Sequence, residues 1–305
     1  MTWFLIALIG PFLYAVTNHI DKILLEKYFK EGGVGTLLIF SALLSAAALP
    51  FLFIADPSAL SVSLANIGAL SVVGILNVLV IWFYLLALKD EEASITVVFY
   101  QLVPVFGVFL GYLFLGEVLT EVQLIAMAII IFGTSIISFE INAENRFRLR
   151  RNTIVFMTLA AFFWALESVI FKAVALEENV VRSLFWEHLM LTVVGIIIFV
   201  CIRSYRGHFI EAVRANSRGI LGLNAANETI YMVGNIVTGF AYLLAPVALI
   251  LLGESYQPLF ALAIGVFFTL FFPRIITEKI EARHLWQKGI AIAITGLGTY
   301  LLLST

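Results

Sequence analysis

A stripe of polar side chains follows one face of an apolar segment in the second half of the chain. Asn224, Asn227, Glu228, Tyr231 and Asn235 fall at i, i+3, i+4, i+7 and i+11, which is one face of an α-helix. Charged groups in hydrocarbon are costly, so they turn towards a protein interior, water or a ligand. The stripe predicts a cavity wall in which Asn227, Glu228 and Tyr231 contact substrate. The alternative is that these groups hydrogen-bond neighbouring helices and hold them together.

A second carboxylate, Glu167, lies near the middle of another apolar segment, three positions after Trp164. Near the N-terminus, Tyr14 and Asn18 occupy a similar helical face. A carboxylate at this depth suits proton or cation binding, and we expect all four residues to contact substrate. The alternative for Glu167 is an internal ion pair or hydrogen bond that fixes helix packing.

Two prolines, Pro104 and Pro258, interrupt apolar segments and are preceded by polar side chains. A proline frees a backbone carbonyl, which lipid tolerates only where protein or a water-filled cavity satisfies that group. The neighbouring polar groups are therefore expected to face the same interior and to bind substrate. They are Tyr100, Gln101, Tyr256 and Gln257, with Asn77 as a further wall.

Three carboxylates are candidates for proton coupling: Glu167, Glu228 and Glu254. In apolar surroundings a carboxyl group exchanges its proton closer to neutral pH than it does in water. Other ionisable groups have plainer interpretations. We expect Lys22 and Lys172 to snorkel from helix ends, and Glu187 and His188 to form a helix-end pair at the membrane interface rather than a proton relay.

The composition is that of an integral membrane protein. Hydrophobic residues make up 62% of the 305 and charged residues 12%, with a mean hydropathy of +1.06, outside the range of soluble domains. A net charge of −2 offers no basic surface to nucleic acid. The single cysteine, Cys201, excludes an internal disulfide framework and a cysteine-based metal cluster. We expect the lipid bilayer and a small molecule as partners, and leave monomer and homodimer open.

Signatures of several enzyme classes are missing from the sequence. It contains no HExxH, GxSxG, P-loop or GxGxxG motif. Neither metal hydrolysis, serine hydrolysis nor ATP coupling is indicated, so we expect no enzyme, no cofactor and no metal site. Any transport would then draw its energy from an ion or substrate gradient.

The expected fold class is an all-α membrane protein with ten transmembrane helices in two inverted five-helix repeats. About 20 apolar residues cross a bilayer core as a helix. The predicted spans are 3–22, 34–54, 66–88, 95–115, 121–139, 153–173, 184–202, 219–242, 246–272 and 285–303.

Two similar stretches indicate an internal duplication. YAVTNHIDK, which begins at Tyr14, aligns with WALESVIFK, which begins at Trp164, at an offset of 150 positions. Because five helices is an odd number, the second unit must be inverted relative to the first, an arrangement typical of secondary transporters that bind substrate near the midplane. The predicted units are 1–141 and 153–305, joined by a polar linker at 142–152.

The distribution of basic residues predicts the orientation. Of the 18 Lys and Arg, all but Lys172 and Arg182 fall in the connectors that follow the odd-numbered spans or at the span ends beside those connectors. The positive-inside rule places those connectors in the cytoplasm and both termini outside.

The stretch YLFLGEVLTEVQLIAMAIIIFGTSII resembles the end of an EamA domain of the drug/metabolite transporter superfamily. The resemblance rests on Gly116, Glu117, Gln123 and Gly133, and WALESVIFK is similar to the opening of a second EamA domain. It implies a ten-helix bundle around a central cavity that exports or exchanges small metabolites. Many family members are described with cytoplasmic termini, opposite to the charge distribution here, so orientation and direction stay open.

The predicted function is a secondary transporter of a small polar metabolite such as an amino acid, working by alternating access with proton coupling as an option. The predicted location is the cell membrane of a bacterium or archaeon, with a multi-pass topology. One alternative is an intramembrane enzyme or flippase acting on a lipid-linked substrate. Another is a scaffold or sensor that transports nothing.

Overall fold

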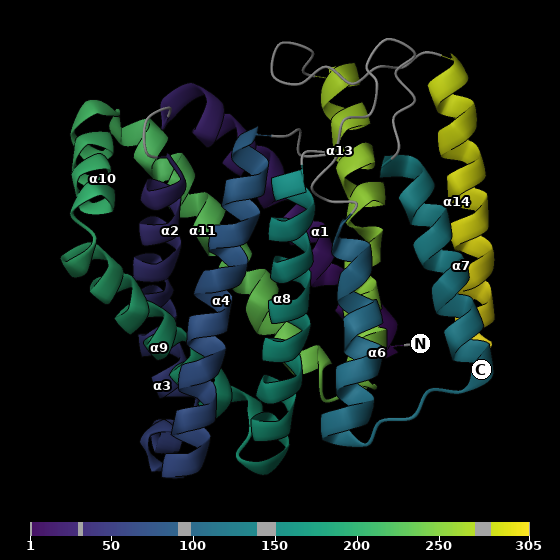
Figure 1. Cartoon of the computed structure of the whole chain (residues 1–305), viewed down its shortest axis with the longest axis horizontal. Coiled ribbons are helices and arrows are strands. Elements are labelled where there is room, and N and C mark those ends of the chain that lie inside the picture. The colour runs from purple at the N-terminus through teal and green to yellow at the C-terminus, as the bar shows by residue number, and fades with distance from the viewer. Residues whose placement is uncertain (1, 30–32, 91–98, 139–150, 272–281, 305) are drawn as a thin grey trace.

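The computed structural model describes residues 2–29, 33–90, 99–138, 151–271 and 282–304, and all regular structure in these ranges is helical (Figure 1). The α-helices are α1 Thr2–Ile23, α2 Gly33–Leu44, α3 Leu49–Ala55, α4 Leu64–Asp90, α6 Leu102–Leu115, α7 Glu121–Ser138, α8 Arg151–Glu177, α9 Val180–Cys201, α10 Arg203–Ala215, α11 Arg218–Ala241, α12 Val247–Leu251, α13 Gln257–Phe271 and α14 Ala282–Leu303. Most of the predicted linker lies outside the described residues.

Within the described ranges, six helical segments are long and apolar enough to cross a membrane. They are Thr2–Ile23, Gly33–Ala55, Leu64–Lys89, Arg151–Glu177, Val180–Cys201 and Val247–Phe268. The shorter apolar helices Phe99–Leu115 and Glu121–Ile136 accompany them. The all-α, multi-pass class predicted from hydropathy is therefore confirmed.

Three of the predicted spans are broken rather than continuous. A 3-10 helix, Ser45–Ala48, separates α2 from α3, a second, Leu252–Tyr256, separates α12 from α13, and a third, Phe99–Gln101, precedes α6. Pro104 and Pro258 consequently lie in the first turn of a new helix, where the missing N–H has no intrahelical partner to lose. The chain restarts its helix at each proline instead of kinking through it.

The predicted connector 203–218 is mostly helical, which the sequence analysis missed. It forms α10, none of whose residues is buried, beside α2 and α9 at the edge of the bundle (Figure 1). This helix is too polar to be found from hydropathy because it contains Arg203, Arg206 and Arg214. Its Phe209 ring packs on Phe40 with ring centroids 4.7 Å apart. Such a helix is amphipathic and lies against the bundle rather than within it.

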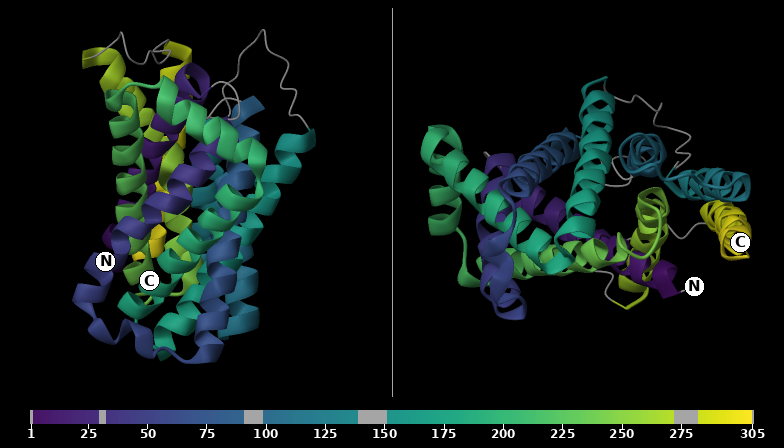
Figure 2. Two further views of the ribbon diagram at one scale, coloured as in Figure 1. Left: turned by 90° about the vertical axis from the view of Figure 1, so that its left-hand side faces the viewer. Right: turned by 90° about the horizontal axis from the view of Figure 1, so that it is seen from below.

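The bundle is held together by pairs that join the two halves of the chain. α1 packs on α11, α4 on α8 and α7 on α14 (Figure 2). The two glycines of α6 receive α12: a Cβ on Gly107 would meet Leu251 at 2.8 Å, and one on Gly111 would meet Val247 at 2.9 Å. The sequence spacing of these glycines predicts such a close helix approach, and the structure confirms it.

Candidate functional site

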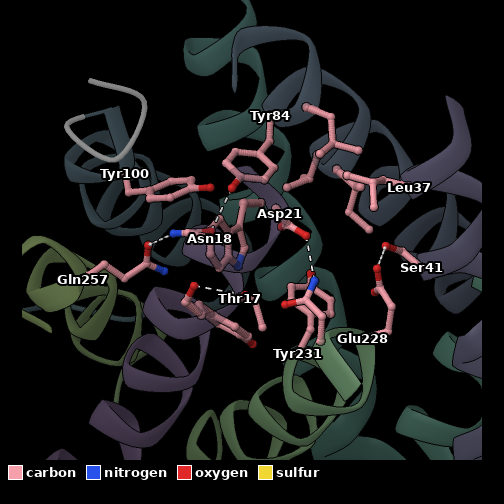
Figure 3. A pocket seen from close by; sticks show the side chains of 16 residues that line it. Thr17, Asn18, Asp21, Leu37, Ser41, Tyr84, Tyr100, Glu228, Tyr231 and Gln257 are labelled. Carbon is pink, nitrogen blue, oxygen red and sulfur yellow. Dashed lines mark hydrogen bonds between the residues drawn. The ribbon is translucent and has the colours of Figure 1, made fainter. Parts of the chain in front are cut away.

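A hollow of about 580 Å³ lies between α1, α2, α4 and α11, with walls from both halves of the chain (Figure 3). We call it the main hollow. Its lining residues are Tyr14, Thr17, Asn18, Asp21, Leu37, Ser41, Val80, Ile81, Tyr84, Leu85, Tyr100, Trp164, Asn227, Glu228, Tyr231 and Gln257.

A chain of hydrogen bonds crosses one side of the main hollow. The Tyr84 hydroxyl donates to Asn18 Oδ1 at 2.9 Å, and Asn18 Nδ2 donates to Gln257 Oε1 at 3.3 Å (Figure 3). Gln257 Nε2 in turn donates to Glu254 Oε2 at 2.8 Å. Every donor points towards the Glu254 carboxylate, so this acceptor fixes the orientation of both amides. Glu254 lies behind the wall, 1% exposed.

The opposite side of the main hollow carries two carboxylates. Asn227 Nδ2 donates to Asp21 Oδ1 at 2.7 Å, and the Ser41 hydroxyl donates to Glu228 Oε1 at 2.8 Å (Figure 3). Both donors are neutral. Among the described residues that line the main hollow, none is Lys or Arg, so neither negative charge is balanced from within this lining.

A second hollow, of about 360 Å³, shares Glu228 and Tyr231 with the main one. It adds Asn77, Glu187 and His188, and we call it the Glu187 hollow. Glu187 and His188 are 4% and 3% exposed. The interface position predicted for this pair is therefore wrong: α9 turns both side chains into the bundle.

A third hollow, of about 380 Å³, contains Glu167 together with Trp164, Glu187 and Tyr231, and we call it the Glu167 hollow. Asn235 Nδ2 donates to Glu187 Oε1 at 3.2 Å. Glu167 Oε2 is buried and has no hydrogen-bond partner. Because Tyr231 lines all three hollows, we treat them as one chamber with three compartments.

Aromatic rings separate these compartments. The ring of Tyr14 lies 5.2 Å from that of Tyr231 and 5.9 Å from that of Trp164, centroid to centroid. Tyr100 meets Trp164 edge-on at 5.3 Å. Tyr14, Trp164 and Tyr231 line both the main hollow and the Glu167 hollow, so their rings form the partition between the two.

Beyond the chamber, near the end of α8, an ion pair ties the halves together. Lys172 Nζ lies 2.5 Å from Glu117 Oε1 and donates to the Ala245 carbonyl at 2.6 Å. The Val247 N–H donates to Glu117 Oε2 at 2.7 Å. Lys172 is only 6% exposed, so its predicted snorkelling position is wrong: the pairing with Glu117 makes burial of its charge tolerable.

A second inter-half ion pair lies at the same end of the bundle, where α9 begins. Arg182 Nε contacts Asp56 Oδ2 at 2.9 Å. The Ser58 hydroxyl and then Arg182 lower the pKa of Asp56 to about 2, so this carboxylate stays ionised at neutral pH.

The chamber brings together most of the residues predicted to bind substrate. Tyr14, Asn18, Tyr100, Trp164, Asn227, Glu228, Tyr231 and Gln257 line the main hollow, while Asn77 and Glu167 line the other two. Gln101 and Tyr256 line none of these hollows. Gln101 bonds to Thr134 and the Ser255 carbonyl, and the Tyr256 hydroxyl bonds to Thr299.

Asp21, Ser41 and Tyr84 also line the main hollow but were not among the predicted substrate contacts. Asp21 lies seven positions after Tyr14, so the sequence already places it on the same helical face. A lone serine in a strongly apolar helix gives no such signal. Among the described residues, no group of three or more His, Cys, Asp or Glu side chains could hold a metal ion.

The N-terminal half of the chain matches the model of a known family, over residues 1–139. The family is the EamA-like transporter family. This confirms the resemblance that Gly116, Glu117, Gln123 and Gly133 indicate from the sequence. The EamA match and the six apolar helices together indicate an integral, multi-pass membrane protein.

A solved structure shares the fold over nearly the whole chain. This structure, titled "Crystal structure of protein", superposes with a TM-score of 0.62 at 15% identity, covering 99% of this chain and 95% of its own. At this identity the likeness concerns the fold alone. None of the curated proteins compared with the chain matches it.

Proposed function

We propose that this EamA-like protein is a secondary transporter that exports or exchanges a small polar metabolite by alternating access. The observation that carries the proposal is the chamber. Its walls come from both halves of an apolar bundle, and it gathers buried polar groups that have no structural partner, such as Glu167 Oε2 and Asn77 Oδ1. Leaving such groups unpaired is costly, so they point to a role in binding.

The proposed architecture has ten membrane spans in two inverted repeats, 1–141 and 153–305. The packing pairs support it. In the two units α1 corresponds to α8, α4 to α11 and α6 to α13. Exchanging counterparts turns the pair α1–α11 into α8–α4 and the pair α6–α8 into α13–α1, and all four pairs are packed. The pairs α2·α9 and α7·α14 map onto themselves. This is the pattern expected of a pseudo-twofold axis in the membrane plane.

In this proposal the units rock against each other and expose the chamber to alternate sides of the cell membrane of a bacterium or archaeon. Substrate contacts come from Tyr14, Asn18, Tyr100, Asn227 and Tyr231. Glu167, Glu228 and Glu254 are the proton-coupling candidates. The basic connectors face the cytoplasm and the termini lie outside, as the charge distribution favours.

The test is transport by purified protein in proteoliposomes, with a metabolite panel and an imposed pH gradient. We expect uptake or counterflow of at least one compound, and a loss of about tenfold or more in Glu228→Gln, since a buried charged contact contributes about 1.5–3 kcal/mol. Glu211→Gln on the exposed face of α10 removes the same charge away from the chamber and should transport normally. Absence of transport for every compound by correctly folded protein contradicts the proposal.

A further inference from the structure

The chamber presents hydrogen-bond acceptors that lack donors. Asn77 Oδ1, Asn227 Oδ1, Asn235 Oδ1 and Glu167 Oε2 are buried atoms without a partner. The amide orientations are not arbitrary, because Asn227 and Asn235 direct their NH₂ groups at the carboxylates of Asp21 and Glu187. The three amide oxygens left over can only accept, and Glu167 Oε2 accepts when its carboxyl group is ionised. Asn77, Asn227 and Glu167 are 2%, 2% and 7% exposed and all line the chamber.

The chamber also gathers four acidic side chains. Asp21, Glu228, Glu187 and Glu167 line it, and none of the described lining residues is Lys or Arg. His188 directs Nδ1 at the Leu184 carbonyl of its own helix. Several carboxyl groups beside spare acceptor oxygens suit a ligand that is both cationic and rich in N–H donors, which describes an organic ammonium group.

These acidic groups fall into two sets separated along α11. One set surrounds Asn227 and Glu228, with Asp21. The other surrounds Asn235, with Glu187 and the neighbouring Glu167 hollow. Glu228 and Asn235 are seven positions apart, which is about 10 Å along a helix axis. The aromatic partition of Tyr14, Trp164 and Tyr231 lies between the main hollow and the Glu167 hollow, whereas Glu187 shares a hollow with Glu228.

We propose that the chamber binds a linear organic dication, an α,ω-diamine or polyamine, with one ammonium group in each acidic set and its apolar chain along the aromatic partition. The proposal rests on the transporter function and specifies its substrate class. The ammonium groups donate to the carboxylates and the spare amide oxygens, and the rings cover the methylene chain while adding cation–π attraction. An amino acid fits less well, because none of the described lining residues is a Lys or Arg that could pair with its carboxylate.

The first experiment measures equilibrium binding to the full-length protein in nanodiscs, by calorimetry. The ligands are α,ω-diamines of increasing chain length, with monoamines, diols and dicarboxylates of matched length. We expect diamines to bind at least about tenfold more tightly than monoamines, the factor that 1.4 kcal/mol represents, with an optimum chain length. Diols and dicarboxylates should not compete. Equal affinity of diamines and monoamines, no dependence on chain length, or no amine binding would each overturn the proposal.

Variants then assign the two ends. Glu228→Gln and Glu167→Gln should each reduce diamine affinity about tenfold while leaving monoamine affinity closer to the parent value, and Glu211→Gln should change neither. Loss of diamine and monoamine affinity by the same factor in both variants contradicts two-ended binding. The chain-length series on the unmodified protein decides the matter if a variant fails to fold.

Proteoliposome counterflow with the best diamine separates this inference from the proposed function. Diamine binding without counterflow supports the substrate class and contradicts transport. Counterflow of amino acids by a protein that binds no amine supports transport and overturns the dication site.

Discussion

At the scale of residues, the hydrogen-bond chain from Tyr84 to Glu254 explains how a polar wall is kept in order inside an apolar bundle. Asn18 is its middle member: it accepts from Tyr84 and donates to Gln257. Each amide has two distinct ends, so a single wrong orientation would leave donors facing donors. The buried Glu254 carboxylate, which only accepts when ionised, sets the direction of the whole chain.

Replacing the middle member should therefore be more damaging than replacing the first. Asn18→Leu leaves the Tyr84 hydroxyl and Gln257 Oε1 without partners and should lower the free energy of unfolding by about 1–3 kcal/mol. Tyr84→Phe removes one hydrogen bond at the edge of the hollow, where water can replace it, and should remove about 0.5–1.5 kcal/mol. Denaturant unfolding in detergent micelles, followed by circular dichroism, measures both. A Tyr84→Phe protein less stable than Asn18→Leu would contradict this order.

How much of the site the sequence predicts depends on whether a residue's helical neighbours reveal its face. Asn227, Glu228 and Tyr231 share a stripe on an apolar helix, and all three line the main hollow. Gln101 was expected there because a proline follows it, but proline indicates a break in the helix and not the direction of a side chain. Its amide lies against Thr134 and Ser255.

At the scale of elements, the close approach of α1 and α11 positions Tyr14. A Cβ added to Gly234 would lie 2.7 Å from Tyr14 Cε1. Glycine at position 234 therefore lets the Tyr14 ring lie against α11 and face Trp164 and Tyr231. Glycine is unfavourable inside a helix by about 1 kcal/mol relative to alanine, so its presence here reflects packing.

Two alanine substitutions on the same helix test this packing. Gly234→Ala should destabilise the protein by about 1–3 kcal/mol through overpacking, less the gain in helix propensity. Gly222→Ala brings the same gain in helix propensity without overpacking, since nothing lies within 4 Å of its added Cβ. Melting temperatures in micelles should therefore fall for the first and rise or hold for the second. Equal shifts in both would mean that Tyr14 is not held by this contact.

Hydropathy predicted the apolar helices well because burial in lipid demands long apolar segments. The predicted span 66–88 corresponds to α4, Leu64–Asp90, and 121–139 to α7, Glu121–Ser138. Hydropathy could not predict α10, whose stability comes from contacts such as that between Phe209 and Phe40. Nor could it predict that α12 and α13 are separate helices, because the 3-10 segment between them, Leu252–Tyr256, is only five residues long and the hydropathy of the span stays high across it.

At the scale of the whole molecule, two ion pairs join the halves at the end where α8 ends and α9 begins. They are Lys172–Glu117 and Arg182–Asp56. The Glu167 hollow is the compartment that includes Ser168 and Tyr242, close to this end. If the halves rock against each other, these contacts hold this end closed and must break when it opens.

Breaking the Lys172–Glu117 pair should therefore favour opening at this end. In a Cys201→Ser background, Ser168→Cys supplies a buried reporter in the Glu167 hollow, since Ser168 is 2% exposed. Adding Lys172→Met should raise its modification rate by a charged thiosulfonate about tenfold, the factor for a shift of 1.4 kcal/mol towards the open state. Lys89→Met, at an exposed position near the opposite end of α4, removes a matched charge and should leave the rate unchanged. Equal rates in the Lys172→Met and Lys89→Met proteins would mean that this ion pair stabilises the fold without controlling access to the chamber.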